Sequence, residues 1–219
     1  SRVKLQKEPF CVYNYVVAPD KGAEVLFVSK NKLALVNPNG FPFINLKLNP
    51  YGKLIRKNQH HTLFDAGFDN IKNIVLSVIE LLRKSPEKYI LNLGVKQINN
   101  KKCQVLKVVN PDFSFSEYIV QEGEDVESIA DKLNLSSYLI LVKNNLSFYN
   151  NVTQGDKIQI PNSYGEQFEI WIDLQSSLPI VQKVFINNKL FEHYEFNNII
   201  INPEFSIDEF KKINTEYNF

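Results

Sequence analysis

Short runs of alternating apolar and polar residues, separated by turn residues, dominate the chain. Between residues 10 and 48 such runs are divided by the turn sequences PDKG at 19–22 and NPNG at 37–40. Turn signals at short and even spacing are typical of an antiparallel meander. Similar runs return in the second half of the chain. The predicted strands are 11–17, 25–28, 33–36, 43–48, 88–98, 102–109, 167–174, 179–186 and 189–197.

One long segment, 65–84, has a helical period instead. Its apolar residues recur every three or four positions and would form one stripe, which consists of Ile71, Ile74, Val75, Val78, Ile79 and Leu82. We expect this helix to end near Ser85 and Pro86 and its stripe to lie on a sheet. A short terminal helix is predicted at 206–212, with Ser206 as N-cap and Glu209 at the capping-box position.

The segment 117–161 interrupts the strand pattern. It reads as a short strand, a glycine turn, two short helices and a second strand, between predicted strands that we expect to be neighbours, 102–109 and 167–174. Its motifs are YIV at 118–120, GEDV at 123–126, SIA at 128–130, Asn144, and GDKIQIP at 155–161. In this order and spacing they resemble the LysM domain, a small βααβ unit. A βααβ unit with antiparallel strands has adjacent ends, so it can be inserted into a hairpin loop.

The resemblance implies binding of glycans that contain N-acetylglucosamine, such as peptidoglycan. It places the groove between the first strand–helix loop and the second helix–strand loop, whose residues here are Gly123, Glu124, Asp125, Val126, Asn145, Leu146 and Ser147. The acidic rim would disfavour the anionic peptide stems of peptidoglycan; its residues are Glu122, Glu124, Asp125 and Glu127. A LysM fold kept as a spacer or protein-contact module is the open alternative.

The remainder of the chain resembles exported proteins of unknown function with the LolA/LolB lipoprotein-carrier architecture. The stretches that carry this resemblance include PFCVYNYVVAPDKGAEVLFV and IWIDLQSSLPIVQKVF. It implies an α+β fold: a curved antiparallel half-barrel, residues 1–116 and 162–219, covered by the 65–84 helix, with the LysM domain at 117–161 inserted. The hollow is either filled by core side chains or lined by the apolar stripe and open to the acyl chains of a lipid or lipoprotein.

Composition limits the partners and the location. Lys and Arg number 25 against 24 Asp and Glu, which gives no electrostatic case for nucleic acid or an anionic membrane. The longest apolar run, 74–82, is too short to span a bilayer.

The chain lacks Met, so we expect a processed, exported protein of the periplasm or cell envelope. Cys11 and Cys103 could be buried thiols or one disulfide, and both alternatives stay open.

No catalytic residue, metal site or cofactor is predicted. His60 and His61 are adjacent, so in an extended segment they point to opposite faces and cannot easily share a metal. Ser128 lacks a Gly-x-Ser-x-Gly elbow, and no glycine-rich phosphate loop is present. The predicted function is non-enzymatic binding of peptidoglycan through the LysM segment. The alternative is a periplasmic carrier or binder of lipid or lipoprotein acyl chains through the half-barrel, with the LysM segment as an anchor or spacer.

Overall fold

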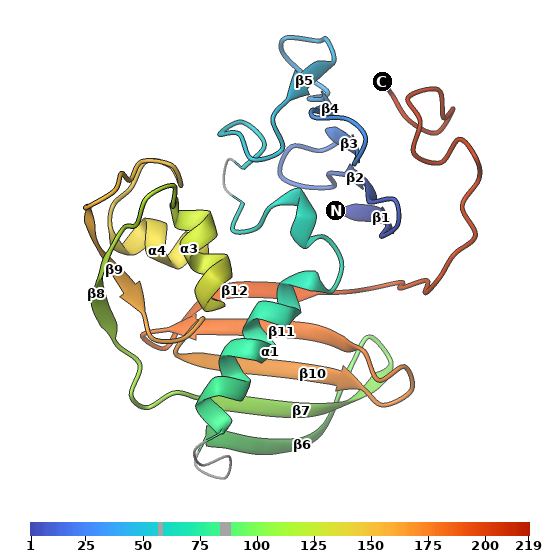
Figure 1. Cartoon of the computed structure of the whole chain (residues 1–219). Coiled ribbons are helices and arrows are strands. Elements are labelled where there is room, and N and C mark those ends of the chain that lie inside the picture. Colours follow the sequence, from blue (N-terminus) through green and yellow to red (C-terminus); the bar gives the residue numbers. More distant parts are fainter. Residues whose placement is uncertain (57–58, 84–88) are drawn as a thin grey trace. The chain divides into compact units, whose positions relative to one another are not determined.

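The computed structural model describes residues 1–56, 59–83 and 89–219, and it divides into two compact units (Figure 1). The first unit comprises residues 1–70 and 201–219, and the second comprises 71–200. Each contains a five-stranded antiparallel sheet. The predicted α+β class is therefore confirmed. The half-barrel is not confirmed, because the strands assigned to it form two separate sheets. The predicted domain boundaries at 117 and 161 stay a prediction.

The first sheet is a simple meander with strands in the order of the chain. Its strands are β1 (Arg2–Gln6), β2 (Cys11–Tyr15), β3 (Glu24–Val28), β4 (Ala34–Asn37) and β5 (Leu46–Leu48). Sequence analysis missed β1, in which charged and polar residues predominate. It also made β5 too long, because Phe43 has a φ of 59° and so cannot continue a strand.

Both faces of the first sheet are covered. On one face Val12, Phe27 and Ala34 form a buried cluster. On the other face Tyr13 and Leu26 pack against Tyr217 from the C-terminal segment. Because side chains alternate between the faces of a strand, Val12 and Tyr13 serve different clusters.

The predicted terminal helix at 206–212 is wrong, since this segment consists of turns. Glu209 accepts a hydrogen bond from Ser206 Oγ at 3.2 Å, as a capping box would suggest. Its carboxylate also pairs with Lys4 at 2.5 Å, and its backbone carbonyl accepts a hydrogen bond from the Tyr217 hydroxyl at 2.7 Å. These contacts to the sheet and to the last residues compete with helix formation.

The second sheet has the order β12-β11-β10-β7-β6. Its strands are β6 (Ile90–Ile98), β7 (Lys101–Val109), β10 (Gln167–Asp173), β11 (Pro179–Ile186) and β12 (Lys189–Glu195). The predicted pairing of the strands on either side of the LysM-like segment is confirmed, because Gln167 of β10 lies opposite Val109 of β7. The two-residue turn between β11 and β12 has positive φ at Asn187 and Asn188, as a type I′ hairpin requires.

Helix α1 (Asp69–Leu82) crosses one face of the second sheet (Figure 1). Its buried residues Ile74 and Val78 belong to one core cluster with residues of the sheet and of the β9–β10 connection, namely Val108, Tyr164, Phe168 and Val184. The helical period of the stripe is thus confirmed. The predicted helix end at Ser85 and Pro86 lies outside the described residues.

Residues 115–161 form a small βααβ subdomain within the second unit. It consists of β8 (Phe115–Ile119), α3 (Val126–Leu133), α4 (Ser137–Lys143) and β9 (Lys157–Pro161). The two strands pair antiparallel, with Phe115 opposite Pro161. Its core contains Val120, Val126, Ala130, Ile129, Leu135, Ile140, Tyr149, Val152, Ile158 and Ile160.

This subdomain also touches the sheet of its own unit. The ring centroids of Tyr138 on α4 and Phe191 on β12 lie 5.8 Å apart. In the part of the chain that the structure describes, no helix is both long and apolar enough to cross a membrane.

Candidate functional site

The first loop of the predicted groove runs from the end of β8 to the start of α3. Gly123 in this loop has a φ of 76°, a conformation that glycine adopts without strain, and a Cβ there would meet no atom within 4 Å. Asp125 is the N-cap of α3: its carboxylate accepts a hydrogen bond from Ser128 N at 2.8 Å, and Ser128 Oγ accepts one from Asp125 N at 2.9 Å. The Asp125 carboxylate is therefore occupied by its own helix.

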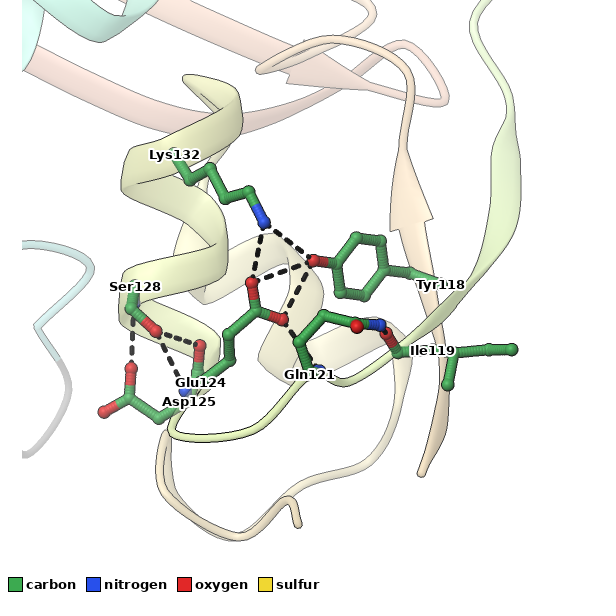
Figure 2. Close-up of polar contacts among 7 residues, drawn as sticks. All are labelled: Tyr118, Ile119, Gln121, Glu124, Asp125, Ser128 and Lys132. Carbon is green, nitrogen blue, oxygen red and sulfur yellow. Dashed lines mark hydrogen bonds and ion pairs between the residues drawn. The ribbon is translucent and has the colours of Figure 1, made fainter. Parts of the chain in front are cut away.

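Figure 2 shows that Glu124 is at the centre of a polar network rather than free on the rim. Its carboxylate accepts hydrogen bonds from the Tyr118 hydroxyl at 2.9 Å and from Gln121 N at 2.9 Å, and it pairs with Lys132 Nζ at 2.9 Å. The hydrogen bond from Lys132 is the main reason that the pKa of Glu124 is lowered, and the same contact raises the pKa of Lys132. The charge of Glu124 is balanced within the subdomain, so the rim is less acidic than the sequence suggests.

The second loop of the groove follows α4. Asn145 is exposed and has a φ of 53°, Leu146 is half-buried against the core of the subdomain, and Ser147 Oγ donates a hydrogen bond to Asn151 Oδ1 at 3.0 Å. The two loops are joined directly, because Val126 N donates a hydrogen bond to Tyr149 O at 2.9 Å. This bond fixes the spacing of the predicted groove.

Asn144, the last position before the second loop, attaches helix α4 to strand β9. Its Nδ2 donates hydrogen bonds to the carbonyl oxygens of Ile140 and Gln159, both at 2.8 Å. Its Oδ1 accepts a hydrogen bond from Gln159 N at 2.7 Å. The Asn144 side chain is thereby a hydrogen-bond partner for backbone groups at the end of α4 and in β9. Asn144 holds the second loop in place.

The structure brings the seven predicted glycan-binding residues together on two adjoining loops, but they differ in what they can offer a ligand. Val126 is fully buried and contributes its side chain only to the core. Gly123, Asn145 and Ser147 are exposed. Leu146 supplies an apolar surface beside them. Loops of this kind can offer backbone hydrogen bonds to an acetamido group and an apolar floor to its methyl group.

Sequence analysis missed Tyr118, Gln121 and Lys132 as the partners of Glu124. Lys132 lies on α3 and Tyr118 on β8, so their approach depends on how the helix packs on the strand. No motif of the sequence gives that packing. The only available signal was the presence of an acid and a lysine eight positions apart on either side of a helix start.

The predicted apolar lining of the host fold is divided. Ile71, Ile74 and Val78 are buried, whereas Val75 is 37% exposed and Ile79 is 42% exposed. The side chain of Leu82 lies outside the described residues. Because Ile74 and Val78 belong to the buried cluster between α1 and the sheet, this part of the stripe packs on protein. The expectation that the whole stripe lies on a sheet is therefore wrong for Val75 and Ile79, which are exposed.

The residues considered for chemistry are dispersed. His61 Nδ1 lies 3.9 Å from Asp65 Oδ2, and Cys11 and Cys103 are both buried free thiols. Desolvation by burial is the main cause of the raised pKa of each cysteine. Within the described ranges, no three side chains of His, Cys, Asp or Glu gather as a metal site would require.

Comparison with known families gives two matches. Residues 1–122 match a family described as a protein of unknown function, DUF1571, and residues 118–161 match the LysM domain. Neither curated proteins nor solved structures give a match. The resemblance to LysM is therefore confirmed, the resemblance to LolA-type carriers is not shown, and no enzyme family is indicated. The DUF1571 match covers more than half of the chain, so the chain belongs to the DUF1571 family and carries a LysM domain at residues 118–161.

Proposed function

We propose that this protein is a non-enzymatic component of the cell envelope that binds N-acetylglucosamine-containing glycan, as found in peptidoglycan. The contact surface would be the groove between the loops at 120–126 and 144–149. The observation that carries the proposal is the LysM match together with the hydrogen bond from Val126 N to Tyr149 O, which holds the two loops side by side.

The polar network of Figure 2 supports a glycan backbone as the ligand rather than its peptide stems. Glu124 is compensated by Lys132, but Glu122 is exposed at the same loop. An anionic stem would meet this carboxylate, whereas an uncharged sugar would not. We therefore expect sacculi stripped of their peptides to bind at least as well as intact sacculi.

Co-sedimentation with purified sacculi tests the proposal with a matched pair of variants. Ser147→Trp places a bulky ring in the groove at an exposed position. Ser116→Trp places the same ring on β8, away from the groove loops. We expect the wild type and Ser116→Trp to sediment with sacculi and Ser147→Trp to remain in the supernatant. Gly123→Trp is a second groove variant, and thermal melting confirms that each protein is folded.

Two results would contradict the proposal. One is a wild-type protein that does not sediment with sacculi, intact or stripped. The other is equal sedimentation of the folded Ser147→Trp and Ser116→Trp variants. The second result would favour a LysM fold that serves as a spacer or a protein-contact module.

A further inference from the structure

The connection between β4 and β5 in the first unit exposes large apolar side chains. Phe41 is 88% exposed, Phe43 is 81% exposed and Ile44 is 61% exposed. We call these three residues the aromatic tip. Single exposed apolar residues are common on soluble proteins, but adjacent ones with this exposure mark an interaction surface.

Hydrogen bonds anchor the loop that carries the aromatic tip. Asn39 N donates a hydrogen bond to Asn37 Oδ1 at 2.9 Å, and Asn39 Nδ2 donates one to Lys21 O at 3.0 Å. Phe43 N bonds to Gly40 O, and the rings of Phe41 and Phe43 meet edge to face at 6.5 Å. Phe43 is in the left-handed region, which is unfavourable for a bulky residue. The loop thus exposes its rings to solvent, although an ordinary strand conformation at Phe43 would strain the backbone less.

The stretch of sequence that contains the tip has a one-sided charge. Residues 25–64 contain no Asp or Glu, and their Lys and Arg residues are Lys30, Lys32, Lys47, Lys53, Arg56 and Lys57. The remaining chain therefore has 19 Lys and Arg against all 24 Asp and Glu. The near-neutral total of the chain hides this asymmetry.

The positive charge reaches the surface beside the tip. Lys47 lies on the edge strand β5, three residues after Ile44, and it is exposed with no carboxylate partner among the described residues. Arg56, by contrast, is buried. Figure 1 shows the β4–β5 connection as a loop that leads into this edge strand of the first unit.

We propose that the aromatic tip inserts into the interfacial region of an anionic phospholipid bilayer. Aromatic rings favour the interface between headgroups and acyl chains, and a lysine beside the rings, here Lys47, is attracted to anionic headgroups. Nearly all of the surface of the two rings faces solvent, so the tip is a projection. A lipid surface accepts a projecting ring without a complementary pocket, which a protein partner would have to supply. This contact is peripheral and is independent of the LysM groove.

Vesicle sedimentation of the full chain tests the inference. The probes are vesicles of phosphatidylglycerol mixed with phosphatidylcholine and vesicles of phosphatidylcholine alone. We expect binding to the anionic vesicles that weakens as salt is added, because salt screens the lysines. Phe41→Ser with Phe43→Ser should lower the vesicle partition coefficient by at least about tenfold, because two rings lose their insertion.

The matched control is Ile207→Ser with Ile213→Ser, which removes two exposed apolar side chains of the same unit that lie outside the tip. This control should bind vesicles as the wild type does. The Phe41→Ser, Phe43→Ser variant should still sediment with sacculi, which separates failure of this inference from failure of the proposed glycan binding.

Three results would overturn the inference. The wild type could fail to bind phosphatidylglycerol vesicles at millimolar lipid. The Phe41→Ser, Phe43→Ser variant could bind vesicles as well as its control does. The tip could instead mediate self-association, seen as a wild-type dimer that this variant converts to a monomer while vesicle binding is absent.

Discussion

The LysM subdomain and the first sheet differ in which parts of the chain complete their cores. The core of the subdomain is built from residues between Val120 and Ile160, and its polar clamp joins Asn144 to Gln159, fifteen positions away. In the first sheet, Glu24 is fully buried and accepts hydrogen bonds from Asn218, which is 194 positions away. One region completes itself locally, whereas the other depends on the end of the chain.

This difference determines how each region should respond to damage. Local closure makes the LysM subdomain sensitive to changes within its own segment and insensitive to the termini. Distant closure makes the first sheet sensitive to loss of a few C-terminal residues.

Deleting residues 217–219 should destabilise the first unit by about 4 kcal/mol. The deletion removes Tyr217, which stacks on Tyr13 at 3.7 Å, and leaves the buried Glu24 carboxylate without Asn218. Hydrogen exchange should show faster exchange at the amides of β2 and β3 and unchanged exchange in α3 and α4. The control is Ile207→Ala, an exposed change in the same C-terminal segment. Slow exchange retained in β2 after the deletion would refute closure by the chain end.

Ile140→Ala should destabilise the LysM subdomain by about 3 kcal/mol. Ile140 is fully buried in its core, and the truncation leaves a cavity. Val142→Ala, two residues further along α4 at an exposed position, should cost below about 1 kcal/mol. Urea unfolding, with hydrogen exchange of α3 and α4 as the readout, measures the loss of stability in both variants. Equal effects of the two variants, or a comparable loss in β2 and β3, would contradict local closure.

Asn144→Ala should cost about 2 kcal/mol in the same subdomain. The change removes three hydrogen bonds and leaves the backbone groups of Gln159 without their partner. Asn150→Ala, at an exposed position directly after the second groove loop, is the control and should be nearly neutral. The same unfolding measurement applies. We also expect Asn144→Ala to weaken sacculus binding, because the second groove loop loses its attachment.

The ion pair of Glu124 and Lys132 should have the smallest effect on stability, and this effect should depend on pH. The folded pKa of Glu124 is below its usual value of 4.5, so its contribution to stability is present above that pH and is lost as the pH falls through the folded value. The folded pKa of Lys132 is above 10.5, so its contribution is present below that pH and is lost as the pH rises through the folded value.

Thermal unfolding of the LysM subdomain at pH 3, 7 and 11 measures this dependence. Lys132→Met should reduce the difference in midpoint between pH 7 and each extreme. Lys157→Met removes another lysine of the subdomain, one paired with Glu117, and serves as the control. An identical pH profile for wild type and Lys132→Met would show that the network of Figure 2 does not act on stability.

The same contrast explains what sequence analysis could find. The LysM segment was recognisable because its core, caps and turns are set by neighbours in the sequence, such as Asp125 with Ser128. The helical period of α1 and the Asn187–Asn188 turn were predictable for the same reason. Each depends on interactions over a few residues.

The errors arose where distant residues decide the structure. The turn segment at 206–212 has a helix-start pattern, yet Glu209 binds Lys4 of the first strand. The single half-barrel domain was expected from the resemblance to LolA-type carriers, which is not shown. The strand pattern could not correct this expectation, because alternation shows that a strand has a buried face but not which sheet it joins. Within the groove, the ion pair that balances the charge of Glu124 could not be predicted without knowing how α3 packs on β8.

The position of the LysM subdomain between two paired strands has a mechanical consequence. Its chain enters from the end of β7 and leaves into the start of β10, and Val109 and Gln167 at these points lie opposite each other. A pulling force on the subdomain therefore draws β7 and β10 in the same direction. The hydrogen bonds between β7 and β10 therefore carry little of that load. The load instead shears the hydrogen bonds that join β7 to β6 and β10 to β11, along the full length of each strand pair. A tether attached in this way resists extension better than one attached at a single strand end.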